Sequence, residues 1–277
     1  MEYYKEYSFD HLSEENMAVL FSLYGFESFQ ENDGTTVLGY ITHSNWEKDN
    51  FETELQNYLN ENNITSQVKD VNPQNWNAIW EASFTPVVVD TFCSVRADFH
   101  PKNASVKHDL VINPKMAFGT GHHGTTWMMM KFMESIDFRG KYVLDYGCGT
   151  GILSILASKC GAKNITAVDV EKESFDNTVD NSIINDTHNI DAVCGTIVDV
   201  SEKKYDVILA NINRHILIDT GQSLVGLLND NDILLLSGVL EAESQMVIDH
   251  YISLGCNFEK MLSREGWVAI KLTKVGV

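Results

Sequence analysis

The chain contains 277 residues, of which 39 are acidic and 20 basic, so its formal net charge at pH 7 is −19. A field of this sign repels phosphate backbones, so nucleic acid is disfavoured as a direct partner, whereas a lysine-rich protein or a cationic small molecule is favoured. The cysteines form no CxxC pair, the N-terminus MEYYKEYSFD lacks a signal-peptide pattern, and no apolar run reaches the roughly 18 residues of a membrane helix, so we expect a cytoplasmic, membrane-free protein.

Residues 1–70 predict a small α+β domain. The segments YYKEYSF, TTVLGYIT and ITSQVKDV are strand-like, and two helices fall between them. Ser13 is placed to cap the first helix and Gly25 to end it. The apolar face expected for that helix is formed by Met17, Leu20, Phe21 and Tyr24, and that of the second helix by Phe51, Leu55, Tyr58 and Leu59. The order fits a ferredoxin-like split βαβ unit with one strand unplaced. Residues 1–70 contain no obvious group of catalytic residues, so we interpret this domain as a substrate-recognition domain. A purely structural lid is the alternative.

The middle of the chain predicts a connector. All four prolines lie between residues 73 and 114, and proline interrupts both helices and central strands. Within NWNAIWEASF, Trp76, Trp80 and Phe84 recur at i, i+4 and i+8, which predicts one aromatic helix face. We therefore expect a helical linker over 71–85 and a second domain over 86–277.

The second domain alternates strands and helices, which is typical of an α/β fold with a parallel sheet covered by helices on both faces. Strands are expected at KYVLDY, NITAVDV, DAVCG, KYDVILANI and DILLLSGVL. One helix is expected to bury Phe175, Val179 and Ile183. The closing segments NFEKMLSREG and WVAIKLTK predict a hairpin that adds one antiparallel edge strand.

The turn after the first of these strands carries a glycine cluster, LDYGCGTG. Gly147, Gly149 and Gly151 allow a sharp turn and close approach of a ligand to a helix N-terminus. Asp145 precedes the cluster and would oppose a pyrophosphate, but it suits a cofactor with a cationic amino-acid end, such as S-adenosylmethionine. Asp169 ends the next strand, where a carboxylate can accept both ribose hydroxyls of either S-adenosylmethionine or a nicotinamide dinucleotide. The spacing resembles that of class I methyltransferases, whose fold is a Rossmann-like seven-stranded sheet.

A second stretch, KMAFGTGHHGTT, lies upstream of that strand. Its adjacent histidines do not suit one metal site, so no metal is expected, and no lysine follows its last glycine as a phosphate loop requires. Thr125 or Thr126 is expected to cap the helix that follows. The stretch resembles the signature AFGTG-x-H-x-TT of the ribosomal protein L11 methyltransferase family, and ANI after the fourth strand is similar too.

The resemblance implies several roles. The signature loop would cover S-adenosylmethionine, with Phe118 and Gly119 near the cofactor and Thr126 hydrogen-bonded to it. The enzyme, a monomer by expectation, would methylate lysine side chains and the N-terminal amine of ribosomal protein L11, and residues 1–70 would hold that substrate. The chain departs from the family pattern at the third strand, which ends in Cys194–Gly195 and offers no acid to bind the adenine amine. Backbone groups are therefore expected to bind that amine.

The chemistry is expected to depend on Asn211. Many amino-methylating enzymes carry Asp/Asn-Pro-Pro-aromatic after the fourth strand; this chain keeps only the asparagine. Its carbonyl can accept a hydrogen bond from an amine and aim the nitrogen lone pair, although a strand-end turn former is the alternative. No general base is identifiable: His122, His123 and His215 are candidates by proximity only. A methyltransferase for another protein or a small amine, and a non-catalytic cofactor-binding module, remain alternative functions.

Overall fold

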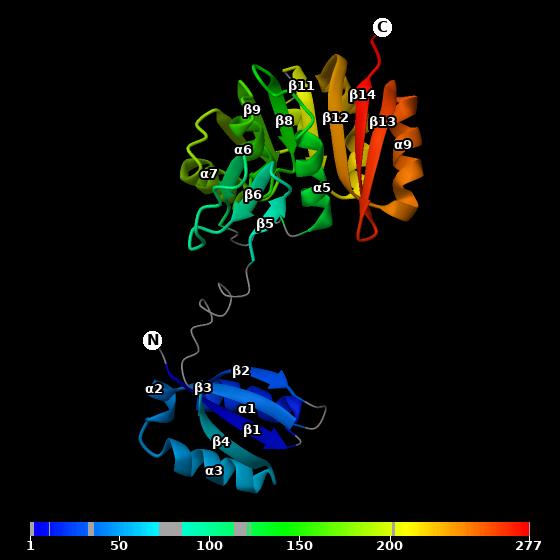
Figure 1. Cartoon of the computed structure of the whole chain (residues 1–277). Helices are drawn as coiled ribbons and strands as arrows, with labels where there is room; N and C mark the ends of the chain where they lie inside the picture. The colour runs from blue at the N-terminus through cyan, green and yellow to red at the C-terminus, as the bar shows by residue number, and fades with distance from the viewer. Residues whose placement is uncertain are drawn as a thin grey trace. The chain divides into compact units, whose positions relative to one another are not determined.

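The computed structural model describes residues 3–10, 12–32, 36–71, 85–113, 121, 123–200 and 203–276. The chain divides into two compact units, residues 1–83 and 84–277, which we describe separately (Figure 1). The predicted linker helix with Trp76, Trp80 and Phe84 lies outside the described residues.

The first unit is an α+β fold with a four-stranded antiparallel sheet in the order β2-β3-β1-β4. Its elements are β1 (Tyr4–Asp10), α1 (Glu14–Tyr24), β2 (Phe26–Glu31), β3 (Thr36–Thr42), α2 (His43–Trp46), α3 (Phe51–Glu61) and β4 (Thr65–Val71). This arrangement confirms the expected ferredoxin-like architecture, and the unplaced strand is β2. It begins one residue after Gly25, whose left-handed backbone (φ 73°) ends α1.

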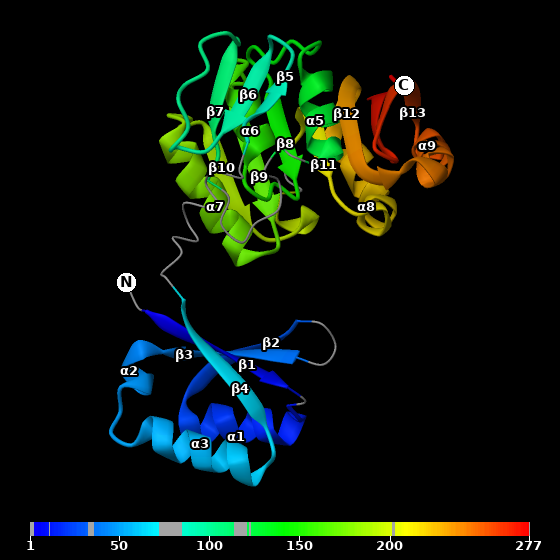
Figure 2. The same cartoon turned by 60° about the horizontal axis from the view of Figure 1, so that its bottom comes forward.

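Both ends of α1 follow the sequence pattern, but its buried face is narrower than expected. The Ser13 side chain accepts a hydrogen bond from the Asn16 N–H at 3.2 Å, so it caps the helix. Leu20 is fully buried with Phe9, Ile41 and others of the first core, on the sheet face that α1 and α3 cover (Figure 2). Phe21, in contrast, is 58% exposed, so its expected place in the core is wrong.

The second unit contains a seven-stranded sheet and a three-stranded sheet. Its elements are β5 (Val87–Val89), β6 (Cys93–Arg96), β7 (His108–Val111), α5 (Gly124–Met133), β8 (Tyr142–Tyr146), α6 (Ile152–Lys159), β9 (Asn164–Asp169), α7 (Lys172–Ile184), β10 (Ile190–Cys194), η1 (Ile197–Val200), β11 (Tyr205–Asn211), α8 (Arg214–Leu227), β12 (Leu228–Leu240), η2 (Glu241–Glu243), α9 (Ser244–Ser253), β13 (Cys256–Arg264) and β14 (Trp267–Lys274). The predicted α/β alternation is thereby confirmed.

The large sheet has the strand order β10-β9-β8-β11-β12-β14-β13, most of which Figure 1 shows side by side. The first five strands are parallel, and β14 runs antiparallel to both β12 and β13. The sequence predicts that the antiparallel strand lies at the edge of the sheet. In the structure the antiparallel strand β14 lies one position inside the edge, which is formed by β13. Burial explains the difference: β14 buries Val268, Ala269, Ile270 and Leu272 on both of its faces, whereas β13 is largely exposed.

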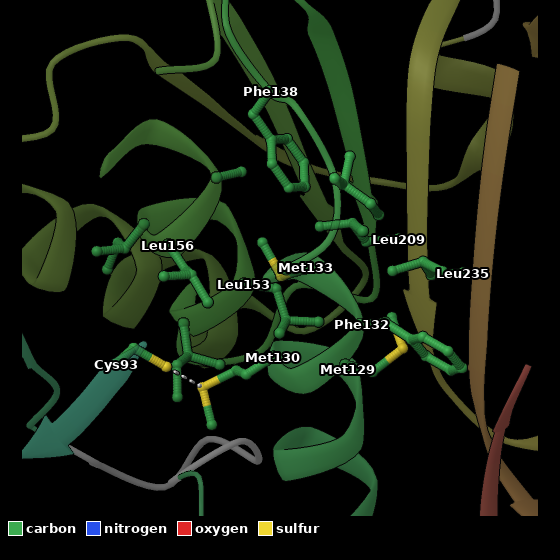
Figure 3. Packing of buried hydrophobic residues seen from close by; sticks show 14 of the residues in the cluster. Cys93, Met129, Met130, Phe132, Met133, Phe138, Leu153, Leu156, Leu209 and Leu235 are labelled. Carbon is green, nitrogen blue, oxygen red and sulfur yellow. Dashed lines mark hydrogen bonds between the residues drawn. The ribbon is translucent and has the colours of Figure 1, made fainter. Parts of the chain in front are cut away.

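Each face of the large sheet has its own hydrophobic core. One core joins α5 and α6 to the three-stranded sheet, and α5 fills it with methionines (Figure 3). Among them, Met130 Sδ lies 3.9 Å from Cys93 Sγ of β6, which ties the small sheet to α5. The other core lies under α8 and α9. These two cores hold the carboxyl ends of the parallel strands in place.

Candidate active site

The carboxyl ends of β8, β9 and β11 meet where the strand order reverses. From β8 the chain proceeds to β9 and β10 on one side, then returns to place β11 on the other side of β8. Ligands of open α/β sheets bind at such a point. A cavity of about 690 Å³ lies here, and its walls include Gly147, Gly149, Asp169 and Asn211. Four of the predicted site residues are thus brought together.

The glycine turn after β8 is shaped by close approach of the chain. Gly147 and Cys148 both donate their N–H groups to the Val168 carbonyl, at 2.8 and 3.1 Å. Gly147 has φ +74°, and a Cβ added to it would lie 2.2 Å from Ile212 Cγ2. A side chain here would force Ile212 to shift and would strain a left-handed backbone, so both the neighbour and the backbone favour glycine.

Ile212 is held from the opposite side by Gly238. A Cβ on Gly238 (φ +85°) would lie 2.2 Å from the Ile212 carbonyl oxygen, and the Ile212 N–H donates to the Ser237 carbonyl at 3.2 Å. The segment after Asn211 is therefore fixed between Gly147 and Gly238. Sequence analysis missed Gly238, although an isolated glycine within the apolar strand LLLSGVL is the signal for a bulge or a close backbone approach.

Asp169 joins the glycine turn to the start of the β9–α7 connection. Its Oδ2 accepts from the Gly149 N–H at 2.9 Å, and its Oδ1 accepts from the Glu171 N–H at 3.0 Å. The side chain is half-buried and lines the cavity. Each carboxylate oxygen keeps a free lone pair, so the group can still accept hydrogen bonds from two hydroxyls. This pair of acceptors fits the hydroxyls of a nucleoside's ribose.

Asp145 does not line the cavity, which corrects the interpretation that it directly faces a cationic cofactor group. Only 1% of it is exposed, and its Oδ2 accepts from both the N–H and the hydroxyl of Ser154, at 3.0 and 2.7 Å. Burial raises the pKa of Asp145 to about 6; the Ser154 hydrogen bonds oppose the rise and the charge of Asp169 adds to it. The carboxylate fixes the first turn of α6 beneath the glycine turn.

Asn211 ends β11, and the described residues provide a partner for only one of its two amide atoms. Its Nδ2 donates to the Thr126 Oγ1 at 3.3 Å. Its Oδ1 is buried, and the described residues provide it with no hydrogen-bond donor. Because a buried acceptor without a donor is costly, this atom indicates a ligand group that carries an N–H or O–H.

The residues of the signature stretch are only partly placed. Phe118, Gly119 and His122 lie outside the described residues, so their expected roles stay predictions. Thr126 is buried in the first turn of α5 against Asn211, while Thr125 and His123 line the cavity. The predicted threonine cap is wrong: the side chain of His123 accepts from the Thr125 N–H at 3.3 Å. The His123 ring also meets the Trp267 ring edge-on at 5.0 Å, which adds a cavity wall that sequence analysis missed.

The inner face of α7 supports the site with polar groups, so the predicted apolar face is wrong. The buried side chains of α7 are Ser174, Asn177, Thr178 and Asn181, whereas Ile183 is 64% exposed. Thr178 Oγ1 donates to the Gly149 carbonyl at 2.9 Å. Polar side chains occupy this face because the irregular glycine turn has backbone groups that no strand or helix satisfies.

Asn181 links two segments at the root of the site. Its Nδ2 donates to the Thr150 carbonyl at 2.9 Å, and its Oδ1 accepts from the Asn113 N–H at 3.0 Å. Asn177 Nδ2 donates to the Asn113 carbonyl at 3.0 Å. The glycine turn and residue 113, which precedes the signature stretch, are therefore attached to the same helix.

Other features bear on the choice of ligand. Gly195 lines the cavity and donates its N–H to the Asp169 carbonyl at 2.8 Å, while the expected backbone recognition of adenine stays a prediction. Among the described residues, no group of three or more His, Cys, Asp or Glu side chains is arranged to hold a metal ion. No helix in the described ranges is long and apolar enough to cross a membrane.

Comparison with known proteins gives consistent matches. Residues 10–275 match the family model described as ribosomal protein L11 methyltransferase (PrmA). The ribosomal protein L11 methyltransferase of Porphyromonas gingivalis is 37% identical over 252 residues, which cover 90% of this chain and 87% of that protein. The protein of the same name from Phocaeicola vulgatus is 34% identical, with 89% of each chain covered. A crystal structure of ribosomal protein L11 methylase from Lactobacillus delbrueckii subsp. bulgaricus has a TM-score of 0.63 at 23% identity, covers 70% of this chain and all of that one, and shares the fold.

Proposed function

The chain belongs to the ribosomal protein L11 methyltransferase (PrmA) family of S-adenosylmethionine-dependent enzymes, and we propose that it methylates amino groups of ribosomal protein L11. The methylated groups are lysine side chains and the N-terminal amine of that protein. The observation that carries the proposal is the buried Oδ1 of Asn211, a residue of the cavity wall, which has no hydrogen-bond donor among the described residues.

The cavity fits the cofactor that the family uses. Asp169 would accept the ribose hydroxyls, and Gly147 and Gly149 of the glycine turn lie in the cavity wall. S-adenosylmethionine supplies, when bound, a methyl group made electrophilic by its sulfonium. The bulk of the cavity wall is apolar, with Ile212, Ile216 and Trp267 among its residues, so few protein groups compete for the polar atoms of the ligand.

Asn211 is proposed as the catalytic residue because it can orient the acceptor amine. The Oδ1 accepts one N–H of a neutral amine, which directs the nitrogen lone pair away from Asn211. Thr126 holds the amide in place through Nδ2, and Gly147 and Gly238 fix the following residue, so little motion remains. An in-line displacement needs such positioning more than it needs a proton acceptor in the same step.

Methyl transfer requires the neutral form of the substrate amine, and the residues around the cavity determine how strongly the charged form is favoured. The side chain of a lysine in water has a pKa near 10.4, so only about one side chain in a thousand is neutral at pH 7. Asp145 is shielded from the cavity, whereas the carboxylates of Asp169 and Glu171 belong to its wall. A neutral amide at Asn211 stabilises the free amine without the preference for an ammonium that a carboxylate would introduce.

We assign substrate recognition to the first unit. Residues 1–70 carry 14 acidic and 3 basic side chains, a density that attracts a basic ribosomal protein. Deleting residues 1–70 is expected to abolish methylation of ribosomal protein L11 while S-adenosylhomocysteine still binds. A truncated chain that methylates the protein at the full rate contradicts this assignment.

Intact-mass analysis of purified ribosomal protein L11 after incubation with the enzyme and S-adenosylmethionine tests the function. We expect mass increments of one methyl group each, mapped by peptide sequencing to amino groups. Loss of labelled methyl transfer to every acceptor tried would indicate a cofactor-binding module without catalysis. Transfer to another protein or to a small amine, with ribosomal protein L11 unmodified, would indicate the alternative substrate class.

A further inference from the structure

A second cavity of about 490 Å³ lies away from the candidate active site, and basic side chains line it. Lys102 and Lys107 come from the segment between β6 and β7, and Lys159 comes from the last turn of α6. The glycine turn precedes the first residue of the same helix. Because α6 has eight residues and a helix rises about 1.5 Å per residue, roughly 12 Å of helix separates the two cavities.

The lysines of this cavity have no carboxylate partners among the described residues. Lys102 and Lys107 are exposed and form no ion pair there, and Lys159 Nζ donates to the Asn185 carbonyl at 2.8 Å. Five other lysines contact carboxylates in the described part of the chain, namely Lys5, Lys69, Lys131, Lys172 and Lys274. Lysines without a described ion pair, such as Lys48 and Lys260, do not line this cavity. Lysines left unpaired together, in a chain with twice as many acids as bases, indicate a place for an external anion.

The one carboxylate in the cavity wall, Asp109, does not neutralise these lysines. Its Oδ2 accepts from Arg96 Nε at 2.9 Å, and its Oδ1 accepts from the Ser94 hydroxyl at 2.8 Å and the Asn103 N–H at 3.4 Å. The carboxylate is therefore satisfied within the protein. The fixed charge that faces the cavity is that of the three lysines.

The pKa of His108, in the wall of the same cavity, is affected by burial and by the charges of nearby lysines. His108 lines the cavity and is mostly buried, with a ring nitrogen 3.7 Å from Cys160 Sγ. Its pKa is lowered by burial first, and then by the charges of Lys107 and Lys159. The lysines thus disfavour a further cation at this place, and they favour an anion for the same reason.

We propose that this cavity, which we call the lysine pocket (Lys102, Lys107 and Lys159), binds the phosphate group of a small molecule. The three lysines that line this cavity provide up to nine N–H donors, of which one is used internally, and phosphate offers several acceptor oxygens. Lysine binds phosphate as a point charge, so the arrangement does not require the planar geometry that arginine imposes.

The charge of the whole chain selects a small anion rather than a polyanion. At physiological ionic strength, fields are screened over about 8 Å, so a bound phosphate group interacts mainly with the lysine pocket. A nucleic acid extends far beyond that distance and meets the field of a protein with net charge −19. RNA binding is therefore the outcome that the structure disfavours.

Isothermal titration of the full-length protein with inorganic phosphate tests the proposal, which does not depend on the proposed function. Replacing two lysines, Lys102→Ala with Lys107→Ala, is expected to weaken phosphate binding by roughly tenfold or more. The control is Lys48→Ala with Lys260→Ala, which changes net charge equally at exposed positions without described ion pairs and is expected to leave binding unchanged. Thermal unfolding of each variant verifies that folded proteins are compared.

Three results would overturn the proposal. The first is the absence of detectable phosphate binding at about 10 mM. The second is equal weakening in the two double variants, which would attribute binding to net charge alone. The third is a short single-stranded RNA that binds more tightly than phosphate and loses affinity with Lys102→Ala and Lys107→Ala, because the ligand would then be a polyanion.

Discussion

The Thr126 hydroxyl oxygen accepts a hydrogen bond from the Asn211 amide nitrogen at 3.3 Å, which joins the first turn of α5 to the end of β11. This contact orients the Asn211 side chain so that its buried Oδ1 has no donor among the described residues. The stretch containing Thr126 and the residue proposed to hold the amine are therefore directly connected, although 85 positions separate them in the sequence.

Replacing the amine-orienting side chain should affect the rate more than cofactor affinity. We expect Asn211→Ala to lower kcat by roughly 100-fold or more, because orientation of the amine is lost. Affinity for S-adenosylhomocysteine, measured by calorimetry, should change little. Asn211→Asp should also be slow, and its activity should recover at higher pH because a carboxylate stabilises the substrate ammonium. Equal losses of rate and cofactor affinity in Asn211→Ala would contradict an amine-positioning role.

The carboxylate at the end of β9 should control cofactor affinity. Asp169→Ala is expected to weaken binding of S-adenosylhomocysteine by about 1–3 kcal/mol, because charged hydrogen bonds to the ribose are lost. The exposed Asp219 of α8 provides a control of equal charge change, and Asp219→Ala should leave the calorimetric affinity unaltered. The prediction fails if Asp169→Ala binds the ligand as tightly as the parent protein.

A comparison of Gly140 with Gly147 distinguishes the cost of a left-handed backbone from the cost of a steric contact. Gly140 (φ +72°) and Gly147 (φ +74°) have similar backbones, but an added Cβ meets nothing within 4 Å at Gly140 and lies 2.2 Å from Ile212 Cγ2 at Gly147. Gly140→Ala should cost about 1–2 kcal/mol of unfolding free energy from its left-handed backbone alone. Gly147→Ala should cost more and should also abolish cofactor binding.

The contact can be isolated by a compensating change. Ile212→Ala removes the methyl group that the new Cβ would strike, so the pair Gly147→Ala with Ile212→Ala should be less destabilised than the two single effects predict. Urea unfolding of the four proteins measures the coupling. Additive effects would show that the steric contact does not determine the requirement for glycine at this position.

Asn181 should be needed by both segments that it links. Asn181→Leu removes the acceptor of the Asn113 N–H and the donor to the Thr150 carbonyl, and it is expected to cost about 0.5–1.5 kcal/mol for each lost hydrogen bond. Asn181→Asp keeps the acceptor for Asn113 but buries a carboxylate oxygen against the Thr150 carbonyl, so its loss of stability should be at least as large. Similar stability of the parent protein and Asn181→Leu would mean that other groups satisfy these atoms.

The sequence was sufficient where local chemistry determines structure. Ser13 and Gly25 predicted both ends of α1, and glycine spacing with Asp169 located the cavity, because capping and left-handed turns depend on few residues. The sequence was insufficient where contacts between distant segments determine which side chains are buried and which strands are neighbours. The polar face of α7 satisfies a turn that no periodicity reveals, and the place of β14 beside β12 depends on burial of both its faces.

The buried carboxylate of Asp145 should make stability depend on pH. Its pKa in the folded protein is about 6, against an ordinary value of 3.8, so the native state binds more protons than the unfolded state between these values. The free energy of unfolding therefore falls as pH rises through this window, by about 3 kcal/mol in total. Asp145→Asn does not titrate, so its stability relative to the parent protein should improve by about 2 kcal/mol from pH 4.5 to 7.5.

Asp137 provides the matched control for this measurement. Arg139 lowers its pKa to about 2, so it is ionised in both states across this range, and Asp137→Asn should show a difference from the parent protein that does not vary between pH 4.5 and 7.5. Hydrogen–deuterium exchange of the β8 peptide in urea reports unfolding of the second unit itself. A relative stability of Asp145→Asn that is constant or falls with rising pH would show that Asp145 is not held in the neutral form by burial.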